Sequence, residues 1–571
     1  MKFNRTAAPN RLLAPRGLGC ALGCALALGS ACTVDVNLIL PGLGTGLGTG
    51  STDDDHAGDD TGDPTTDGGE DTGSHTLLDL GDGDGYDELF CGVSDAELDA
   101  PLPCDRQTPS SVIDPVVAWT WTGPHGEDSV IVTPVVANLD DDNADGRVDL
   151  CDTPDIVVIA VDLPPNKTDL VPPGRIYVLD SKSGTTKLVI NHPIDPSATP
   201  VLADLDGDGV PEIIAFERTV ALEPGEIGPR RVVAFQADGA LLWVSEATVY
   251  AEGAGALSVA DLDGDGSPEI LAPEHVLSAE GQLLWAPPNP PLANSVPIAV
   301  DLDLDGELEV LFGGSVYSSD GVLLFDLQLP GGMNTGVAAV ANFDDDPYPE
   351  IYVQSSNHRI LEHDGTLKLA CGGGSGDPVA IQDIDGDGKA EILHAHANWF
   401  NVMAIVDDEC VTVWSSKIDD LSASSSGTAF DFLADGGAES VYADLTSVRL
   451  FSEHGELLAQ IPRLARSSTA NPVVVDADNN GAANIIIVGS EPLGGDPLAG
   501  ARASVIFIQN SDDRFAPTRR IWNQHAYYGT NIREDGRVPT DQAPHWLDAN
   551  NFRANSAPSY VGALCQAPPI E

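Results

Sequence analysis

Residues 204–212 read Asp204-Leu205-Asp206-Gly207-Asp208-Gly209-Val210-Pro211-Glu212, an acidic loop with a short apolar run on either side. Residues 261–269 repeat this pattern with the same spacing. Carboxylates at positions one, three, five and nine, with glycine at position six, are what a hard cation requires of a tight loop. Alternate side chains of the turn point inward, and glycine permits the sharp bend. The pattern therefore predicts a metal site in each such loop.

The chain contains eight copies of this loop, which begin at Asn138, Asp204, Asp261, Asp301, Asn342, Asp383, Asp431 and Asp476. Three copies are complete, and the copy at Asp301 lacks only the small residue at position four. The candidate metal ligands of these four loops are Asp204, Asp206, Asp208, Glu212, Asp261, Asp263, Asp265, Glu269, Asp301, Asp303, Asp305, Glu309, Asp383, Asp385, Asp387 and Glu391.

The other four copies depart from the pattern. One has Pro347 in place of glycine, one ends on Asn484, one has Leu433 at position three, and the first is expanded. Their candidate ligands are Asn342, Asp344, Asp346, Glu350, Asp476, Asp478, Asn480, Asp140, Asp142 and Asp145. An acidic, glycine-containing segment can also be an ordinary turn, and for the loop at Asp431 that alternative stays open.

The spacing of the loops predicts the fold. Units of about forty residues with alternating apolar runs are typical of four-stranded antiparallel blades. In one unit the expected strands are 199–203, 212–215, 231–235 and 241–244, with a glycine turn before the last. Short strands with such regular turns predict an all-β propeller, because a ring of blades leaves no long sheet edge exposed.

A strand count indicates how the ring closes. Two strands, 484–488 and 504–508, follow the last loop without a fourth, and an unpaired apolar run at 116–121 precedes the first loop. Pairing this N-terminal strand with the last three gives eight blades. Seven blades, with one degenerate unit outside the ring, is the alternative.

Loops of this form between two such strands resemble the FG-GAP (VCBS-type) repeats of the integrin alpha-chain β-propeller and its bacterial relatives. The resemblance covers about residues 115–510. It implies that the loops bind Ca²⁺ through their acidic side chains and one backbone carbonyl. It also implies that the calcium loops lie on one face of the ring and that a protein or glycan ligand binds the other.

The composition limits the possible partners. The 571 residues carry a formal net charge of −62, with 27 Lys and Arg against 89 Asp and Glu. Such a surface repels phosphates, so the sequence excludes nucleic acid as a partner. Bound cations would neutralise part of the charge.

The N-terminus predicts export. Basic residues, an apolar run and small residues within 1–31 follow the order of a signal peptide. Cys32, after Ser30 and Ala31, resembles the lipidated cysteine of bacterial lipoproteins, with Cys24 as a rival. The resemblance implies a lipoprotein at the outer membrane or surface of a Gram-negative bacterium, which contacts the membrane only through its lipid. Plain secretion is the alternative.

Further domain boundaries follow from composition. Residues 32–75 form an acidic Gly/Asp/Thr-rich spacer, too polar to bury a core. The expected sequel is a Cys-containing segment (76–114), the propeller (115–511) and a cap rich in Trp, Asn and His (512–571). Cysteines of an exported protein favour disulfides, and Cys91 with Cys104 is the predicted pair; other pairings stay open.

The sequence supports two functions. No nucleophile elbow, HExxH motif or phosphate-binding loop is present. The first interpretation is a non-enzymatic surface module that binds a protein or glycan. The second is a calcium-dependent polysaccharide lyase, since some such lyases resemble this fold. A lyase requires a central pocket with a base and a basic residue, for which the acidic composition offers little.

Overall fold

The computed structural model describes residues 109–144, 146–164, 170–220, 228–249, 255–288, 295–326, 337–344, 346–354, 358–372, 378–422, 424–466, 469–490, 503–547 and 549–556. All of them belong to one unit, Asp82–Glu571. The predicted signal peptide and spacer, Cys32, the Cys91–Cys104 pair and Asp145 lie outside the described residues.

The strands of the N-terminal half are β1 (Pro115–Trp121), β2 (Ser129–Val130), β3 (Val135–Ala137), β4 (Asp155–Val161), β5 (Gly174–Asp180), β6 (Thr186–Ile194), β7 (Val201–Ala203), β8 (Glu212–Glu217), β9 (Arg231–Phe235), β10 (Leu241–Val244), β11 (Ser258–Ala260), β12 (Glu269–Ala272), β13 (His275–Leu277), β14 (Leu283–Trp285), β15 (Ile298–Val300), β16 (Glu309–Phe312), β17 (Ser315–Tyr317) and β18 (Leu323–Asp326).

Those of the C-terminal half are β19 (Ala338–Ala341), β20 (Glu350–Gln354), β21 (His358–Leu361), β22 (Leu367–Cys371), β23 (Ala380–Gln382), β24 (Glu391–His396), β25 (Trp399–Val406), β26 (Glu409–Lys417), β27 (Thr428–Phe430), β28 (Glu439–Ala443), β29 (Ser447–Phe451), β30 (Leu457–Pro462), β31 (Val473–Val475), β32 (Asn484–Val488) and β33 (Val505–Asn510). Two 3₁₀ turns, η1 (Pro124–Gly126) and η2 (His545–Leu547), are the helical elements of the described residues.

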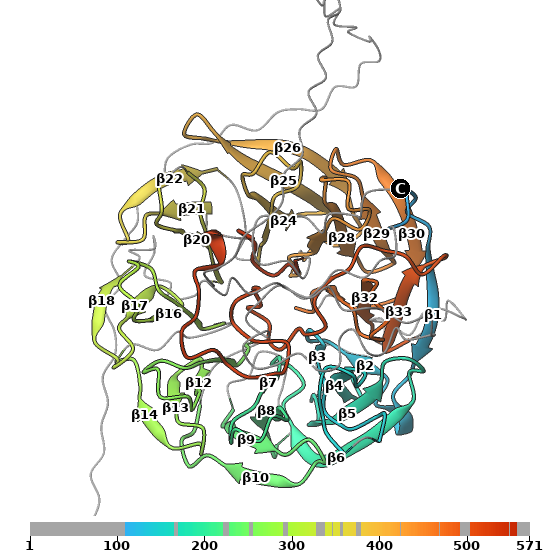
Figure 1. The fold of residues 1–571 in the computed structure, drawn as a ribbon, viewed down its shortest axis with the longest axis vertical. Coiled ribbons are helices and arrows are strands. Elements are labelled where there is room, and N and C mark those ends of the chain that lie inside the picture. Colours follow the sequence, from blue (N-terminus) through green and yellow to red (C-terminus); the bar gives the residue numbers. More distant parts are fainter. Residues whose placement is uncertain are drawn as a thin grey trace, which may run out of the picture. The chain divides into compact units, whose positions relative to one another are not determined.

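The fold is all-β and propeller-like, as the repeat predicts. Six sheets have four antiparallel strands each, and a seventh has nine. The nine-stranded sheet contains two four-stranded units, β3–β6 and β7–β10, joined by one bridge between Ile194 and Glu217, with β2 added beside β4. In Figure 1 the units follow one another in sequence order around a common centre.

The predicted pairing of the N-terminal strand is confirmed. β1 pairs antiparallel with β33, so the sheet that contains the last acidic loop has the order β1-β33-β32-β31. The first and the last strand of the described fold thus belong to one sheet.

An aromatic ring on the fourth strand joins neighbouring sheets. Trp243 lies against Gly281 in the hairpin of the next unit, where an added Cβ would approach the ring to 2.4 Å. Trp285 packs on Gly321 in the same way, and its Nε1 donates to the Ser319 carbonyl at 2.9 Å. Glycine is required in these hairpins because its φ is positive and the ring fills the space. Trp243 and Trp285 are therefore packing residues between neighbouring sheets.

A disulfide also connects neighbouring units. Cys371, at the end of β22, bonds to Cys410 in β26. The sequence left this pairing open. Cys151 is disulfide-bonded as well.

The segment after β33 is the element that contacts every unit. Its backbone exchanges two hydrogen bonds between Trp522 and Val136 of β3, at 2.8 and 2.9 Å, and two between Phe552 and Ile381 of β23, at 2.8 and 3.0 Å. In Figure 1 it runs, coloured red, across the middle of the ring of sheets. Its further bonds reach Leu202 of β7, Val259 of β11, Ala299 of β15, Val340 of β19, Thr428 of β27 and Val474 of β31. The C-terminal segment therefore ties the first strands of all the units to one another.

Arg553 tests this role. Its fully buried guanidinium donates to the carbonyls of Val379 at 2.8 Å and Ala338 at 3.1 Å, which lie in neighbouring units. Burial lowers the pKa of Arg553 to about 9. Arg553→Met leaves two buried carbonyls without donors, and we expect the free energy of unfolding to fall by about 2–4 kcal/mol. Chemical denaturation measures it. The exposed Arg514→Met is the control, with an expected change below about 0.5 kcal/mol; equal losses would contradict the assigned role.

Candidate metal-binding loops

In six of the eight loops the last acidic residue is buried and bonded to the loop's own backbone. Glu212, the first residue of β8, accepts a hydrogen bond from the Leu205 amide at 2.8 Å. The same bond recurs in the loops that end on Glu269, Glu309, Glu350, Glu391 and Glu439, at 2.7–3.0 Å. This bond occupies one carboxylate oxygen and fixes the position of the other at the start of the second strand.

The first acidic residue holds the turn together. One oxygen of Asp204 accepts from the Gly207 amide at 2.7 Å, and the other accepts from the Gly209 amide at 2.9 Å. Gly209 has a φ of +90°, in the left-handed region that glycine adopts without strain. Asp261 and Asp383 make the equivalent pairs of bonds. The invariant spacing of aspartate and glycine thus builds the loop before any ion binds.

In five loops, three carboxylates come together so that one oxygen of each lies within 4.8 Å of the others. All five groups consist of oxygen ligands, which hard cations prefer. The groups are Asp204, Asp206 and Glu212; Asp261, Asp263 and Asp265; Asp301, Asp303 and Glu309; Asp344, Glu350 and Glu362; and Asp383, Asp385 and Glu391.

The predicted ligands at position five mostly accept hydrogen bonds from backbone amides of their own loop. Asp208 accepts from the Val210 amide at 2.9 Å, and Asp305, Asp346 and Asp387 make the same bond to the residue two positions on. Glu362, by contrast, was not predicted. It lies at the start of a hairpin turn, outside the repeat motif, and only its place beside the folded loop reveals it.

The other three loops, at Asn138, Asp431 and Asp476, bring no such trio together among the described residues. In the last loop Asn480 donates to Asp478 at 3.1 Å and to Asp513 at 2.9 Å. Burial raises the pKa of Asp476 to about 6 and that of Asp478 to about 8. The loop at Asp431 retains its buried Glu439 but has no carboxylate at position three.

Lysines occupy the centre of two loops, and the sequence reasoning did not identify them. Lys187 of β6 contacts Asp140, and its Nζ lies 2.8 Å from Asp142 and 3.0 Å from Asp155. Lys368 of β22 contacts Asp344, with Nζ 2.5 Å from Glu350 and 3.3 Å from Glu362. The sequence does contain a signal for these lysines: each stands on the fourth strand at a position where four other units have leucine.

The buried glutamates show that the loops are short of positive charge. Burial raises the pKa of Glu212, Glu269 and Glu309 to about 7, and that of Glu391 and Glu439 to about 8; nearby aspartates raise it further, against the backbone hydrogen bond. A bound cation would favour the charged form instead. Crowded, desolvated carboxylates therefore fit the hard cation that the spacing predicts.

These pKa shifts predict a pH dependence for the metal-free protein. A glutamate whose pKa is about 7–8 when folded, against 4.5 as the ordinary value, binds its proton more tightly in the folded state. The resulting stabilisation is complete below about pH 4.5 and is lost as the pH rises through 7–8. We expect the melting temperature in EDTA to fall between pH 5 and pH 8.5, and the gain on adding Ca²⁺ to grow over the same range. A gain that shrinks toward pH 8.5 would contradict this reading.

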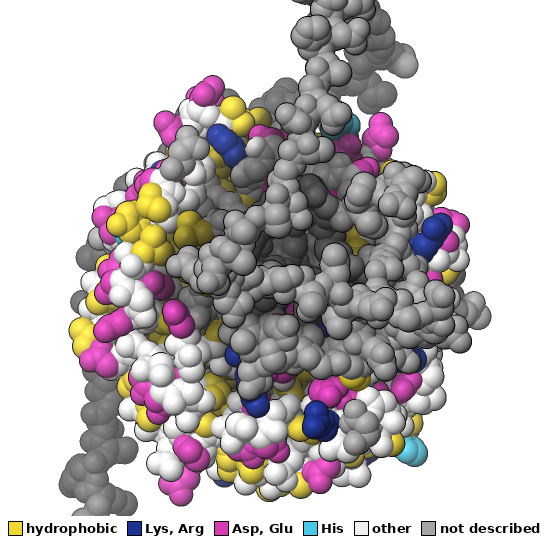
Figure 2. Space-filling model, in the orientation of Figure 1, with side chains coloured by type: hydrophobic (Ala, Val, Ile, Leu, Met, Phe, Trp, Pro, Cys, Tyr) yellow, Lys and Arg dark blue, Asp and Glu magenta, His cyan; other side chains and the backbone are white. Residues whose placement is uncertain are grey.

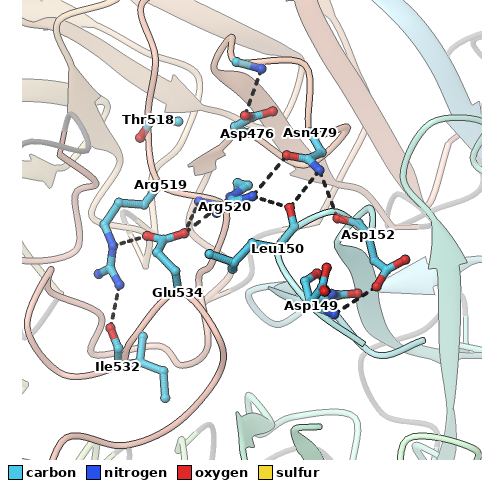
Figure 3. Close-up of polar contacts among 12 residues, drawn as sticks. Asp149, Leu150, Asp152, Asp476, Asn479, Thr518, Arg519, Arg520, Ile532 and Glu534 are labelled. Atoms are coloured by element: carbon cyan, nitrogen blue, oxygen red, sulfur yellow. Dashed lines mark hydrogen bonds and ion pairs between the residues drawn. The ribbon is translucent and has the colours of Figure 1, made fainter. Parts of the chain in front are cut away.

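The C-terminal segment also covers the acidic loops. Arg520 donates to the Leu150 carbonyl of the first loop at 2.6 Å and contacts Asn479 of the last loop at 3.3 Å, while Glu534 accepts from the Arg520 amide at 3.1 Å (Figure 3). Asn479 in turn donates to Leu150 at 3.2 Å. The first and the last loop are therefore joined through the segment, at the position where the ends of the repeat meet.

A pocket of about 250 Å³ lies between two loops and this segment. Asp263 and Asp301 line it from the loops, and Thr540 and Gln542 line it from the segment. Acidic side chains are spread around the periphery of the face shown in Figure 2, with few basic ones among them. A ligand in this pocket would have to tolerate negative charge or reach it through a bound cation.

Two histidines that could have suggested a metal site, His394 and His525, are buried. His394 of β24 stacks edge-on against His358 with ring centroids 4.6 Å apart, and burial lowers its pKa to about 3. In the C-terminal segment, burial beside Arg553 lowers the pKa of His525 to about 3. Both are neutral at physiological pH, and in the described residues neither belongs to a metal-ligating group.

Comparison with known proteins identifies the fold but not the family. No protein-family model matches the sequence, and no curated protein matches it. The V. cholerae biofilm matrix protein Bap1 is similar in structure, with a TM-score of 0.64 and 21% identity over 78% of this chain and 99% of Bap1. At this identity the similarity shows the fold alone.

Two lyases resemble the chain less. The exotype rhamnogalacturonan lyase YesX has a TM-score of 0.48 and 14% identity, and a rhamnogalacturonan lyase of Bacillus licheniformis has 0.45 and 16%; each comparison covers 81% of this chain and 83% of the lyase. Among the described residues, no helix is long and apolar enough to cross a membrane.

Proposed function

We propose that this protein is an exported, calcium-stabilised propeller of eight blades that binds a protein or glycan and catalyses no reaction. The observation that carries the proposal is the recurrence of the three-carboxylate group in five loops of one architecture, four of which hold no lysine among their carboxylates. The FG-GAP resemblance and the lipid anchor at Cys32 remain predictions within it.

The strand order supports eight blades. The two units within the nine-stranded sheet are each a complete meander, and with the six separate sheets they make eight. The contacts of Arg520 between the first and last loops support closure of the ring there.

Calcium suits the loops better than other ions. Their ligands are carboxylates on a flexible, glycine-containing turn, whereas Mg²⁺ demands a near-ideal octahedron and transition metals favour His or Cys. Asp204, Asp206 and Glu212 would hold the ion in the best-formed loop. The ion would neutralise their charge and so stabilise the turn; the residues themselves place the oxygens.

Binding is favoured over catalysis by what fills the centre. The C-terminal segment fills the centre with side chains that are fully buried and pack among the first strands: Trp522, Tyr527 and Arg553. A lyase would instead need an open central pocket with an ionisable base. The excess of acidic residues would also repel an acidic polysaccharide.

The ligand would bind the face opposite the acidic loops. In an antiparallel meander the first and third turns share one end of the strands, and the other connections share the opposite end. Seven of the eight acidic turns have the same length, but the opposite connections range from the short link between β12 and β13 to the long one between β32 and β33. Connections of unequal length on a rigid scaffold are typical of binding surfaces.

The loops should differ in their need for calcium. Asp206→Ala or Asp385→Ala removes one carboxylate from a trio and should lower the number of bound calcium ions by one. Asp435→Ala, in the loop that has Leu433 at position three, should leave the number unchanged. Isothermal titration of the metal-free protein counts the sites. Equal losses in all three variants would mean that the ligands are assigned wrongly.

The function itself is tested by exposing the full mature chain to a glycan array, with and without EDTA, and to acidic polysaccharides in solution. We expect calcium-dependent retention of a neutral glycan or of a protein ligand, and no unsaturated product by ultraviolet absorbance. Calcium-dependent cleavage of a polysaccharide would overturn the proposal in favour of a lyase.

A further inference from the structure

The two lysines that enter acidic loops occupy one structural position. Lys187 and Lys368 each lie three residues after the glycine of their hairpin, Gly184 and Gly365. In four other units the same position is an exposed leucine on the fourth strand. These leucines are Leu242, Leu284, Leu324 and Leu458.

From this position a lysine reaches the loop of its own unit. Lys368 is only 12% exposed, and its ammonium lies between the buried Glu350 and the partly exposed Asp344 and Glu362. Lys187 is 20% exposed and contacts the buried Asp155 in the same way. Asp155 begins β4 just as Glu350 begins β20, so both ammonium groups meet the carboxylate that starts the second strand.

The same two loops also differ at position one. They begin with Asn138 and Asn342, whereas the other six begin with aspartate. The amide of Asn138 donates to the Asp149 carbonyl at 2.5 Å, and that of Asn342 donates to the Asp346 carbonyl at 2.5 Å. An aspartate could not donate these bonds. In both loops the side-chain nitrogen of the asparagine therefore donates a hydrogen bond to the loop backbone.

These two substitutions compensate each other in charge. Replacing aspartate by asparagine removes one negative charge from the loop, and replacing a divalent cation by an ammonium removes one positive charge. The net charge of a loop with asparagine and lysine therefore equals that of a loop with aspartate and a divalent ion. Asparagine at position one and lysine on the fourth strand occur together in both loops. Neither residue occurs at these positions in the four units with leucine.

We propose that Lys187 and Lys368 are built-in cations that take the place of the metal ion in their loops, so that these two blades fold without calcium. Burial alone would lower the pKa of Lys368, but its hydrogen bonds to Asp344 and Glu350 raise it, so the ammonium stays charged at physiological pH. The inference rests on the proposed calcium sites of the other blades. It divides the ring into blades that respond to calcium and blades that do not.

The test exchanges the two kinds of loop. Lys368→Met keeps the length of the side chain and removes its charge, and Leu324→Lys places a lysine at the equivalent position beside Asp301, Asp303 and Glu309. Exposed Lys417→Met and the uncharged Leu324→Met are the matched controls. Each full-length variant is measured for calcium stoichiometry by titration and for melting temperature in EDTA and in millimolar Ca²⁺.

We expect Lys368→Met to melt about 1–3 °C lower than wild type in EDTA, and to recover in calcium with one additional bound ion. Leu324→Lys should bind one calcium ion fewer than wild type, and EDTA should lower its melting temperature by less. If Lys368→Met behaves like Lys417→Met in EDTA and gains no site, or if Leu324→Lys keeps the wild-type stoichiometry, the proposal is wrong.

The two levels of inference fail differently. A wild-type protein that binds no calcium would contradict the proposed function and the built-in cation alike. A wild-type protein that binds calcium but cleaves a polysaccharide would contradict the proposed function alone. If Lys368→Met does not fold in EDTA but folds in calcium, the proposal is supported. If Lys368→Met folds in neither condition, the calcium stoichiometry of Leu324→Lys decides: one ion fewer than wild type supports the proposal, and the wild-type number contradicts it.

Discussion

A buried carboxylate at the start of the second strand is the constraint on which seven of the eight units depend; the last unit has Asn484 there. It must be there to hold the loop backbone, as Glu212 holds the Leu205 amide at 2.8 Å. It is then surrounded by further carboxylates that the turn itself requires. A desolvated cluster of this kind is costly unless a positive charge enters it. The chain meets that need in two ways: by a lysine from the fourth strand, or by leaving the oxygens open to an ion.

The C-terminal segment turns separate sheets into one body. Neighbouring units contact each other through aromatic rings on hairpin glycines and one disulfide, each of which involves only two units. The segment instead bonds to the first strand of every unit and joins the first loop to the last through Arg520. Its side chains Trp522, Tyr527 and Arg553 are fully buried and pack among the first strands.

Most of the architecture was predictable because its signals are local. The strand predicted at 231–235 is β9, Arg231–Phe235, and the N-terminal strand predicted at 116–121 is β1, Pro115–Trp121. Alternating apolar residues and glycine turns specify such elements without reference to distant parts. The spacing of Asp301, Asp303 and Glu309 likewise anticipated a trio that the fold assembles.

What the sequence did not reveal depends on contacts between distant segments. Lys368 of β22 reaches Glu350 of β20 across the intervening strand β21, and Glu362 enters the same site from a hairpin, so neither belongs to the nine-residue motif. The Cys371–Cys410 bond crosses from one unit to the next, and spacing alone cannot choose it among the possible pairs. The C-terminal segment has no periodicity, so its contacts follow only from the folded ring.

The most direct test of this account is an anomalous difference map from crystals grown with Tb³⁺ in place of Ca²⁺. The account predicts peaks in the loops at Asp204, Asp261, Asp301 and Asp383, and none beside Lys187 or Lys368. Four vacant aspartate loops, or an ion bound next to either lysine, would contradict it.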